Sequence, residues 1–134
     1  MPNTFPKHNL ETAPEKSKPL LRQLLEQSGP NGFYSVTAES PETLTAYAML
    51  HKAFMASSFT NEEKTVIWQT INVENQCHFC VPAHTYMAKA MKIDKAVSDA
   101  LRNETALPTA RLEALRDFTL LMLRNDGNAS DTEI

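Results

Sequence analysis

The segment from Cys77 to His84, which reads CHFCVPAH, constrains the fold of this chain more than any other part of its sequence. A proline ring lacks an N–H group and clashes with the carbonyl four residues earlier, so Pro82 fits only the first turn of a helix. A helix is therefore expected to begin at about residues 78 to 81, which places Cys80 at or near its first residue. Unpaired backbone N–H groups and the positive end of the helix dipole stabilise a thiolate there.

The histidine that ends this segment lies on the same face of the expected helix as the second cysteine. Cys80 and His84 are separated by one helical turn, so their side chains lie on one face of the helix. The imidazole can therefore take or relay the thiol proton. Met87 and Met91 continue the same face, which indicates that the thiol and the imidazole point toward a partly apolar pocket.

The chain contains only two cysteines, Cys77 and Cys80. A disulfide between them closes a very short loop and adds little stability, unlike the scattered cysteine pairs of small secreted domains. Neighbouring thiols can instead exchange electrons, since one thiolate attacks and the other resolves the product as a disulfide. The pair therefore predicts a reversible Cys77–Cys80 disulfide.

Composition and charge exclude several classes of function. The 134 residues are 42% hydrophobic and carry a net charge of −3, which is typical of one soluble domain with a real core. The acidic balance offers no basic stripe for nucleic acid. We find neither an apolar run of roughly 18 residues, the length of a membrane span, nor the apolar stretch of a signal peptide. We therefore expect a cytoplasmic protein without membrane or nucleic-acid partners.

Apolar periodicity and turn residues predict an all-α chain of about six helices, because no segment alternates with the period of a strand. Residues 1–13 are expected to form an extended N-terminal arm, and residues 14–134 one helical domain. At the end of the chain, Ser130 to Glu133 resembles a fresh helix start, so we expect the chain to stop short of a last helix. The expected helices are residues 14–27, 41–57, 60–75, 79–92, 94–102 and 108–124.

Several of these helix starts depend on local capping residues. Ser40 is followed by Pro41, a cap with proline at the first helical position. Thr60 and Glu63 have the spacing of a capping box, and Asp94 can cap the next short helix. In the helix that follows Thr60, the expected buried residues are Val66, Ile67, Thr70 and Ile71.

The cysteine segment resembles the alkylhydroperoxidase D-like and carboxymuconolactone decarboxylase family. The signature of that family is a glutamate, eleven spacer residues, a Cys-x-x-Cys pair, three further residues and a histidine. Cys77, Cys80 and His84 match the second half of this signature, and the order of helices over about residues 40–125 also fits. The resemblance thus covers roughly two thirds of the chain and implies an alkylhydroperoxidase D-like helical fold.

The resemblance implies a thiol-dependent peroxidase, an antioxidant oxidoreductase that reduces hydroperoxides without cofactor or metal. Cys80 is then the peroxidatic cysteine that becomes a sulfenic acid, Cys77 is its resolving partner, and His84 belongs to the proton relay. The resulting disulfide needs an external dithiol reductant. The resemblance also implies homo-oligomers, often trimers or hexamers.

One position departs from the family signature. Thr65 occupies the place of the family glutamate, twelve residues before Cys77. Glu62 lies one turn earlier on the same helical face and is our candidate replacement. Glu63 is already used as the capping-box acid, and Glu74 is a third candidate because it lies close to the cysteines in sequence.

Other interpretations of the cysteine segment stay open. The decarboxylase branch of the family is a lyase that acts on a lactone by acid–base chemistry and does not require the cysteine pair. A helical redox-sensing module without enzymatic activity is a second alternative. The cysteines could also be buried packing residues, or zinc ligands together with His84 and either His78 or His51. Haem attachment is excluded because Val81, and not histidine, follows Cys80.

Overall fold

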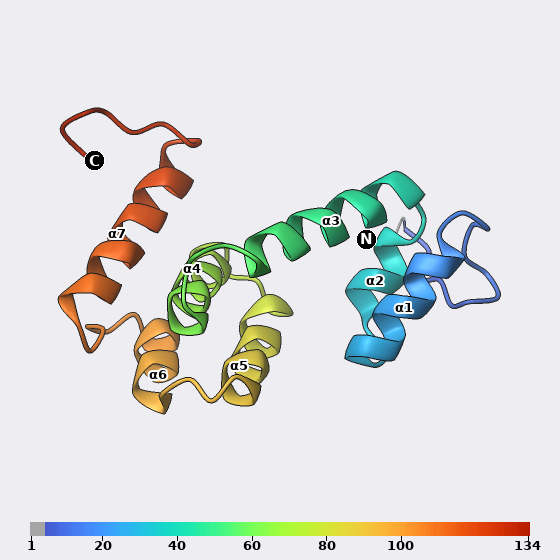
Figure 1. The fold of residues 1–134 in the computed structure, drawn as a ribbon, viewed down its shortest axis with the longest axis horizontal. Helices are drawn as coiled ribbons and strands as arrows, with labels where there is room; N and C mark the ends of the chain where they lie inside the picture. Colours follow the sequence, from blue (N-terminus) through green and yellow to red (C-terminus); the bar gives the residue numbers. More distant parts are fainter. Residues whose placement is uncertain (1–4) are drawn as a thin grey trace. The chain divides into compact units, whose positions relative to one another are not determined.

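The computed structural model describes residues 5–134, which form seven helices and no strand (Figure 1). The predicted all-α class is confirmed, with one helix more than the six expected. None of the helices in this described range is both long and apolar enough to cross a membrane. The helices are α1 (Lys18–Ser28), α2 (Gly32–Thr37), α3 (Pro41–Met55), α4 (Asn61–Glu74), α5 (Cys80–Ala90), α6 (Lys95–Asn103) and α7 (Ala110–Arg124).

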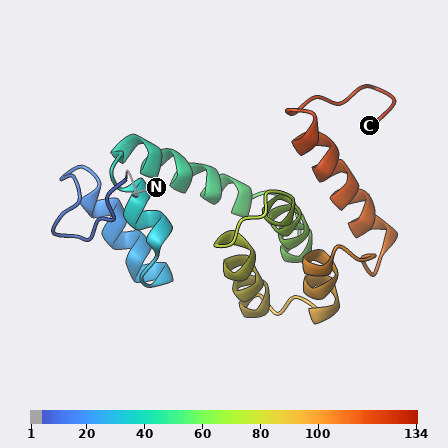
Figure 2. The ribbon, with the colours of Figure 1, turned by 180° about the vertical axis from the view of Figure 1, so that it is seen from behind.

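The chain divides into two compact units, one that ends at Ser57 and one from Ser58 to Ile134. The first unit holds α1, α2 and α3, and α1 and α2 lie side by side in both views (Figures 1 and 2). Its buried core is formed by Ala13, Leu21, Ala38 and Leu44. The expected division into an arm up to residue 13 and one domain from residue 14 stays a prediction.

The first unit corrects two sequence-based expectations. Helix α1 begins at Lys18 and not at residue 14, because Pro19 has to lie in the first helical turn. Helix α2 was not expected, since six residues are too few to show a helical period. Its start is fixed by Asn31, whose side chain accepts a hydrogen bond from the backbone N–H of Phe33 at 2.9 Å.

The second unit is built around α4, which packs against α5, α6 and α7. Its apolar core contains residues from α4, α6, α7 and the connection between α6 and α7, namely Val66, Val97, Ala100, Leu101, Leu107 and Leu112. The predicted capping box of α4 is confirmed, with Thr60 and Glu63 each accepting from the backbone N–H of the other. The predicted Asp94 cap of α6 is confirmed as well.

The buried face of α4 differs from the prediction. Val66 and Thr70 are buried as expected, whereas Ile67 and Ile71 are only half-buried. Polar side chains of α4, among them Gln69, are buried instead. Gln69 forms a hydrogen bond with α5, so the interface between these two helices contains a polar layer. Apolar periodicity alone could not indicate this layer, since it counts hydrophobic residues only.

Helix α7 is attached to α4 at both of its ends. It begins at Ala110, two residues later than expected, because Thr109 is its N-cap and Pro108 precedes the helix. Near its start the Arg111 guanidinium donates to the Glu63 carboxylate at 2.7 Å. At its end Arg124 donates two hydrogen bonds to Glu74, at 2.6 and 2.9 Å.

Candidate active site

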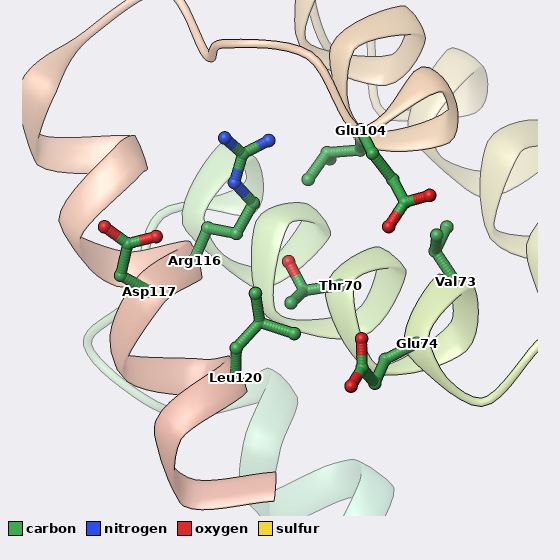
Figure 3. A pocket seen from close by; sticks show the side chains of 8 residues that line it. Thr70, Val73, Glu74, Glu104, Arg116, Asp117 and Leu120 are labelled. Carbon is green, nitrogen blue, oxygen red and sulfur yellow. The ribbon is translucent and has the colours of Figure 1, made fainter. Parts of the chain in front are cut away.

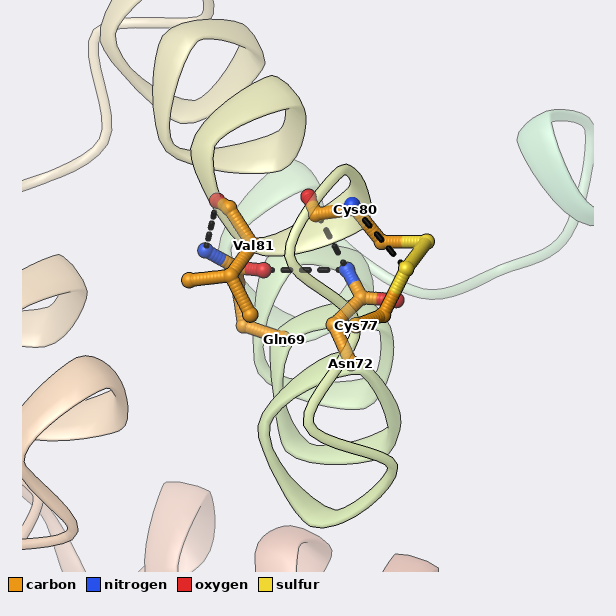
Figure 4. Close-up of a disulfide and its surroundings, with 5 residues drawn as sticks. All are labelled: Gln69, Asn72, Cys77, Cys80 and Val81. Atoms are coloured by element: carbon orange, nitrogen blue, oxygen red, sulfur yellow. Dashed lines mark hydrogen bonds between the residues drawn. A yellow bond between two sulfur atoms is a disulfide. The ribbon is translucent and has the colours of Figure 1, made fainter. Parts of the chain in front are cut away.

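Cys77 and Cys80 form a disulfide, with 5.2 Å between their Cα atoms (Figure 4). Cys80 is the first residue of α5, as the position of Pro82 predicts, and Cys77 lies in the turn between α4 and α5. Both cysteines are half-buried. The structure thus places the pair at the N-terminus of α5, at the positive end of the helix dipole, which favours a thiolate.

The turn that holds Cys77 is a Schellman motif at the end of α4. The backbone N–H of Cys77 donates to the carbonyl of Asn72 at 3.0 Å, and that of Gln76 donates to the carbonyl of Val73 at 2.9 Å. Gln76 takes the left-handed conformation that this motif requires, with φ of 50°. The motif fixes the first cysteine directly after α4, but glutamine at the usual glycine position leaves no sequence signal for it.

A backbone N–H group of α5 points at the sulfur of the first cysteine. The N–H of Cys80 donates a hydrogen bond to Sγ of Cys77 at 3.1 Å (Figure 4). This group belongs to the first helical turn, where backbone N–H groups have no partner within the helix. A hydrogen bond of this kind favours negative charge on the Cys77 sulfur when the disulfide opens.

Two buried amide side chains of α4 support the first turn of α5 (Figure 4). Gln69 is 1% exposed, and its Nε2 donates to the carbonyl of Val81 and to the hydroxyl of Thr85, both at 3.0 Å. Its Oε1 accepts from Nδ2 of Asn72 at 3.0 Å, and the same Nδ2 approaches the carbonyl of Cys80 at 3.5 Å. The amides therefore fix the backbone that carries the second cysteine.

Sequence reasoning missed these amides, although their spacing held a signal. Thr65, Gln69 and Asn72 are polar and recur at the intervals of one helical face in a helix that has to pack on its neighbours. All three are buried. A buried polar stripe predicts a hydrogen-bond network with an adjacent element, because buried amides without partners are costly.

His84 lies one helical turn after Cys80 in α5, where the sequence places it. Its ring is half-buried and meets the Trp68 indole edge to face, with ring centroids 4.9 Å apart. Trp68 comes from α4, so the imidazole sits where α5 meets α4. A ring held between two helices has a fixed orientation, which suits a proton relay.

The candidate carboxylates of α4 have different surroundings, and Glu62 and Glu63 lie in its first turn, at the end of the helix away from the cysteines. Glu62 is half-buried and forms neither a hydrogen bond nor an ion pair with any described residue. The backbone N–H of Thr60 and the guanidinium of Arg111 both bind Glu63 and hold the pKa of its carboxyl below its usual value. Thr65 is buried and donates its hydroxyl to the Asn61 carbonyl at 2.9 Å. Of these residues, Glu62 has the carboxylate that is still available.

Glu74, the third candidate acid, is bound to α7. Its hydrogen bonds from Arg124 lower the pKa of its carboxyl. Glu74 lines a cavity of about 210 Å³ between α4, the end of α6 and α7, together with Thr70, Glu104 and Asp117 (Figure 3). Glu74 therefore joins α4 to α7, which is a structural role.

A metal site would need a cluster of suitable side chains. Within residues 5–134, no group of three or more His, Cys, Asp or Glu side chains is arranged to hold a metal ion. His78, one of the ligands considered for zinc, is exposed. The two sulfurs are instead bonded to each other.

Comparison with models of known protein families yields no match to this chain, and comparison with curated proteins yields none either. The chemistry of the site therefore rests on the local geometry of its cysteines. Vicinal thiols at a helix N-terminus, one helical turn before a histidine, form the kind of environment in which cysteines are reactive. Such a site can transfer two electrons by opening and closing its disulfide.

Proposed function

We propose that this protein is a thiol oxidoreductase that reduces hydroperoxides through a Cys77–Cys80 dithiol/disulfide cycle. The proposal rests on the disulfide at the first residue of α5, together with the resemblance of the segment to alkylhydroperoxidase D-like proteins. A disulfide in such a short loop contributes little to stability, so its value lies in its chemistry. The proposed cycle has three steps.

In the first step, the Cys80 thiolate attacks the terminal oxygen of a hydroperoxide, ROOH. The sulfur–oxygen bond forms as the oxygen–oxygen bond breaks, which leaves a sulfenic acid on Cys80 and releases the alcohol ROH. The N-terminal end of α5 favours the thiolate. His84, one turn further along, supplies the proton that the leaving alkoxide needs.

In the second step, the Cys77 thiolate attacks the sulfur of the Cys80 sulfenic acid. The disulfide forms, and hydroxide leaves and is protonated to water. The hydrogen bond from the N–H of Cys80 stabilises the attacking thiolate, and the Schellman turn keeps Cys77 within reach.

In the third step, an external dithiol reduces the disulfide. Its thiolate attacks Sγ of Cys80, and Cys77 leaves as the thiolate because the N–H of Cys80 already points at its sulfur. The second thiol of the reductant then releases Cys80 and becomes oxidised itself. Over the whole cycle, ROOH and a dithiol give ROH, water and a disulfide.

Glu62 completes the proposed proton relay in place of the family glutamate. It is half-buried and has no ionic partner among the described residues, whereas Glu63 and Glu74 are held by arginines. We further propose that the protein acts in the cytoplasm, as the sequence predicts, and that it forms a homo-oligomer, a trimer or a hexamer, as the resemblance implies. The exposed aromatic side chains Phe79 and Phe118 are suited to contacts between subunits.

The decisive experiment is mass spectrometry of the thiols after exposure to a hydroperoxide. The wild-type protein should lose two hydrogens, consume one peroxide per cycle and regain its thiols with dithiothreitol. Cys77→Ser should instead stop at a sulfenic acid on Cys80. If the disulfide forms but the protein turns over no peroxide with any common dithiol as reductant, the non-enzymatic redox-sensing module is the better interpretation. If peroxide leaves the thiols unchanged, the lyase is favoured.

A further inference from the structure

A groove of about 680 Å³ lies between α5 and α6. Its walls are two stripes with the same spacing, at positions i, i+3, i+4 and i+7 counted from Pro82 in α5 and from Lys95 in α6. This spacing places each stripe on one face of its helix. Ile93, from the connection between the helices, contributes to the lining.

The groove is separate from the cysteine site. At 3.6 residues per turn, the stripe from Pro82 to Lys89 points to the side of α5 opposite that of Cys80 and His84. Thr85, within this stripe, donates its hydroxyl to the carbonyl of Val81 at 2.7 Å and accepts from Gln69. The proposed peroxide chemistry does not use this groove.

The groove carries an excess of positive charge. Three basic side chains line it, and of these Lys95 is paired with Asp99. Lys89 and Arg102 form no ion pair with any residue in the range that the structure describes. Two uncompensated cations therefore face a site that has no free carboxylate, so the groove favours an anion.

The remaining lining is largely apolar. Pro82, Tyr86 and Ile93 offer carbon surface, and Tyr86 is 75% exposed, so this surface is open to a ligand. The hydroxyl of Thr85 is already used within the protein, which leaves the two cations and Ser98 for polar recognition. An apolar cleft with a few convergent polar groups and this volume is typical of small-molecule sites.

We propose that the α5–α6 groove binds a small organic anion that carries an apolar chain, such as a medium-chain carboxylate. The Arg102 guanidinium offers a planar fork for the carboxylate, and Lys89 adds positive potential. The apolar chain of the ligand covers Pro82, Tyr86 and Ile93 and removes their exposed carbon surface from water. Charge and apolar surface together select this ligand class over neutral or cationic amphiphiles.

Octanoate titrated into the whole protein tests the inference, with calorimetry for affinity and amide chemical shifts for location. We expect one saturable site with a dissociation constant of about 1 mM or tighter, and shifts confined to α5 and α6. Arg102→Gln and Lys89→Gln should each weaken binding about threefold or more. Tyr86→Ser, at an exposed position, should weaken it as well. Lys92→Gln, an exposed lysine outside the groove, is the matched control and should bind as the wild type does.

Equal affinity for octanoate, octanol and octylamine would overturn the inference, as would unchanged binding by the Lys89→Gln, Arg102→Gln double variant. Absence of saturable binding to the wild type would overturn it as well. The Cys77→Ser, Cys80→Ser double variant should bind octanoate normally, because the groove lies on the other face of α5. This variant separates a failure of the groove from a failure of the peroxidase proposal.

Discussion

The backbone N–H of Cys80 donates a hydrogen bond to Sγ of Cys77 at 3.1 Å, so the second cysteine of the pair polarises the first. This relationship gives the two sulfurs different roles although they are three residues apart. When a thiolate attacks the Cys80 sulfur, this N–H stabilises the negative charge that develops on Cys77, which makes Cys77 the leaving group. An incoming thiolate is then directed to Cys80.

The first prediction concerns this asymmetry. In Cys77→Ser treated with a hydroperoxide, a sulfenic acid should be trapped at Cys80 by dimedone and detected by mass spectrometry. In the wild type, a small thiolate should open the Cys77–Cys80 disulfide by attacking Sγ of Cys80, which forms the mixed disulfide there and releases Cys77 as a thiolate. Cys80→Ser is the matched control, and a sulfenic acid trapped only in that variant, at Cys77, would reverse the two roles.

The second prediction concerns the amide layer beneath the site. Gln69→Leu removes two donors and one acceptor from a buried network that includes Asn72 and Thr85. We expect the free energy of unfolding to fall by about 1 to 3 kcal/mol, because a buried amide loses its partner. Urea denaturation measures this change. Gln23→Leu, at an exposed position of α1, should change stability by less than about 0.5 kcal/mol, and equal losses would contradict the argument.

The third prediction uses a buried hydroxyl. Within the described residues, Oγ1 of Thr70 is buried and has no hydrogen-bond partner, whereas the hydroxyl of Thr119 donates to the Leu115 carbonyl at 2.7 Å. Thr70→Val should therefore raise the free energy of unfolding by about 1 kcal/mol, and Thr119→Val should lower it by about 0.5 to 1 kcal/mol. Thermal and urea unfolding of both variants measure the free energy of unfolding. We expect it to change in opposite directions, although both substitutions replace a hydroxyl with a methyl group.

The fourth prediction is a pH dependence. Hydrogen bonds from the Thr60 backbone and from Arg111 lower the pKa of Glu63 from its ordinary value of 4.5. A carboxyl whose pKa is lower in the folded than in the unfolded state stabilises the protein at pH values above its unfolded-state pKa. This stabilisation is lost as the pH falls through its folded-state pKa. Glu63→Gln should thus be less stable than the wild type at pH 7, and the difference should shrink toward pH 3.

The matched control for Glu63 is Glu26→Gln, at an exposed position of α1. Urea denaturation at both pH values should show little change for this control at either pH. If the difference in stability between the wild type and Glu63→Gln is the same at both pH values, the charge of the Glu63 side chain does not contribute to the stability of the helix start.

Helix boundaries in this chain were predictable where the determining contact is local. Ser40, Thr60 and Asp94 each cap a helix through a partner two or three residues away, so the sequence displays both members of the contact. The N-terminal position of Cys80 was predictable for the same reason, since Pro82 restricts the backbone within one turn. The fold class follows from such local rules and from apolar periodicity.

Contacts between distant residues were not predictable in this way. The network of Gln69 joins residues 12 and 16 positions apart, and Arg124 reaches Glu74 across 50 positions. Gln76 adopts a left-handed backbone conformation that glycine usually marks in a sequence. Side chains whose partners lie on another helix become visible only once the helices are packed.

The last prediction decides which acid serves the proposed proton relay. If Glu62 replaces the family glutamate, Glu62→Gln should slow peroxide reduction by about 100-fold or more, the effect of losing a positioned general acid or base. Its stability should stay near that of the wild type, because the Glu62 carboxylate has no hydrogen bond or ion pair with any described residue. Stopped-flow kinetics with a hydroperoxide and a dithiol measure the rate.

Glu63→Gln is the matched control for this last experiment, since it removes the neighbouring carboxylate. It should lower stability and leave the rate of peroxide reduction almost unchanged, because the Glu63 carboxylate is held by Thr60 and Arg111. Equal and normal rates in both variants would exclude Glu62 and leave His84 with water as the relay. A large rate loss in Glu63→Gln alone would assign the relay to the capping carboxylate, with Arg111 as the group that keeps it ionised.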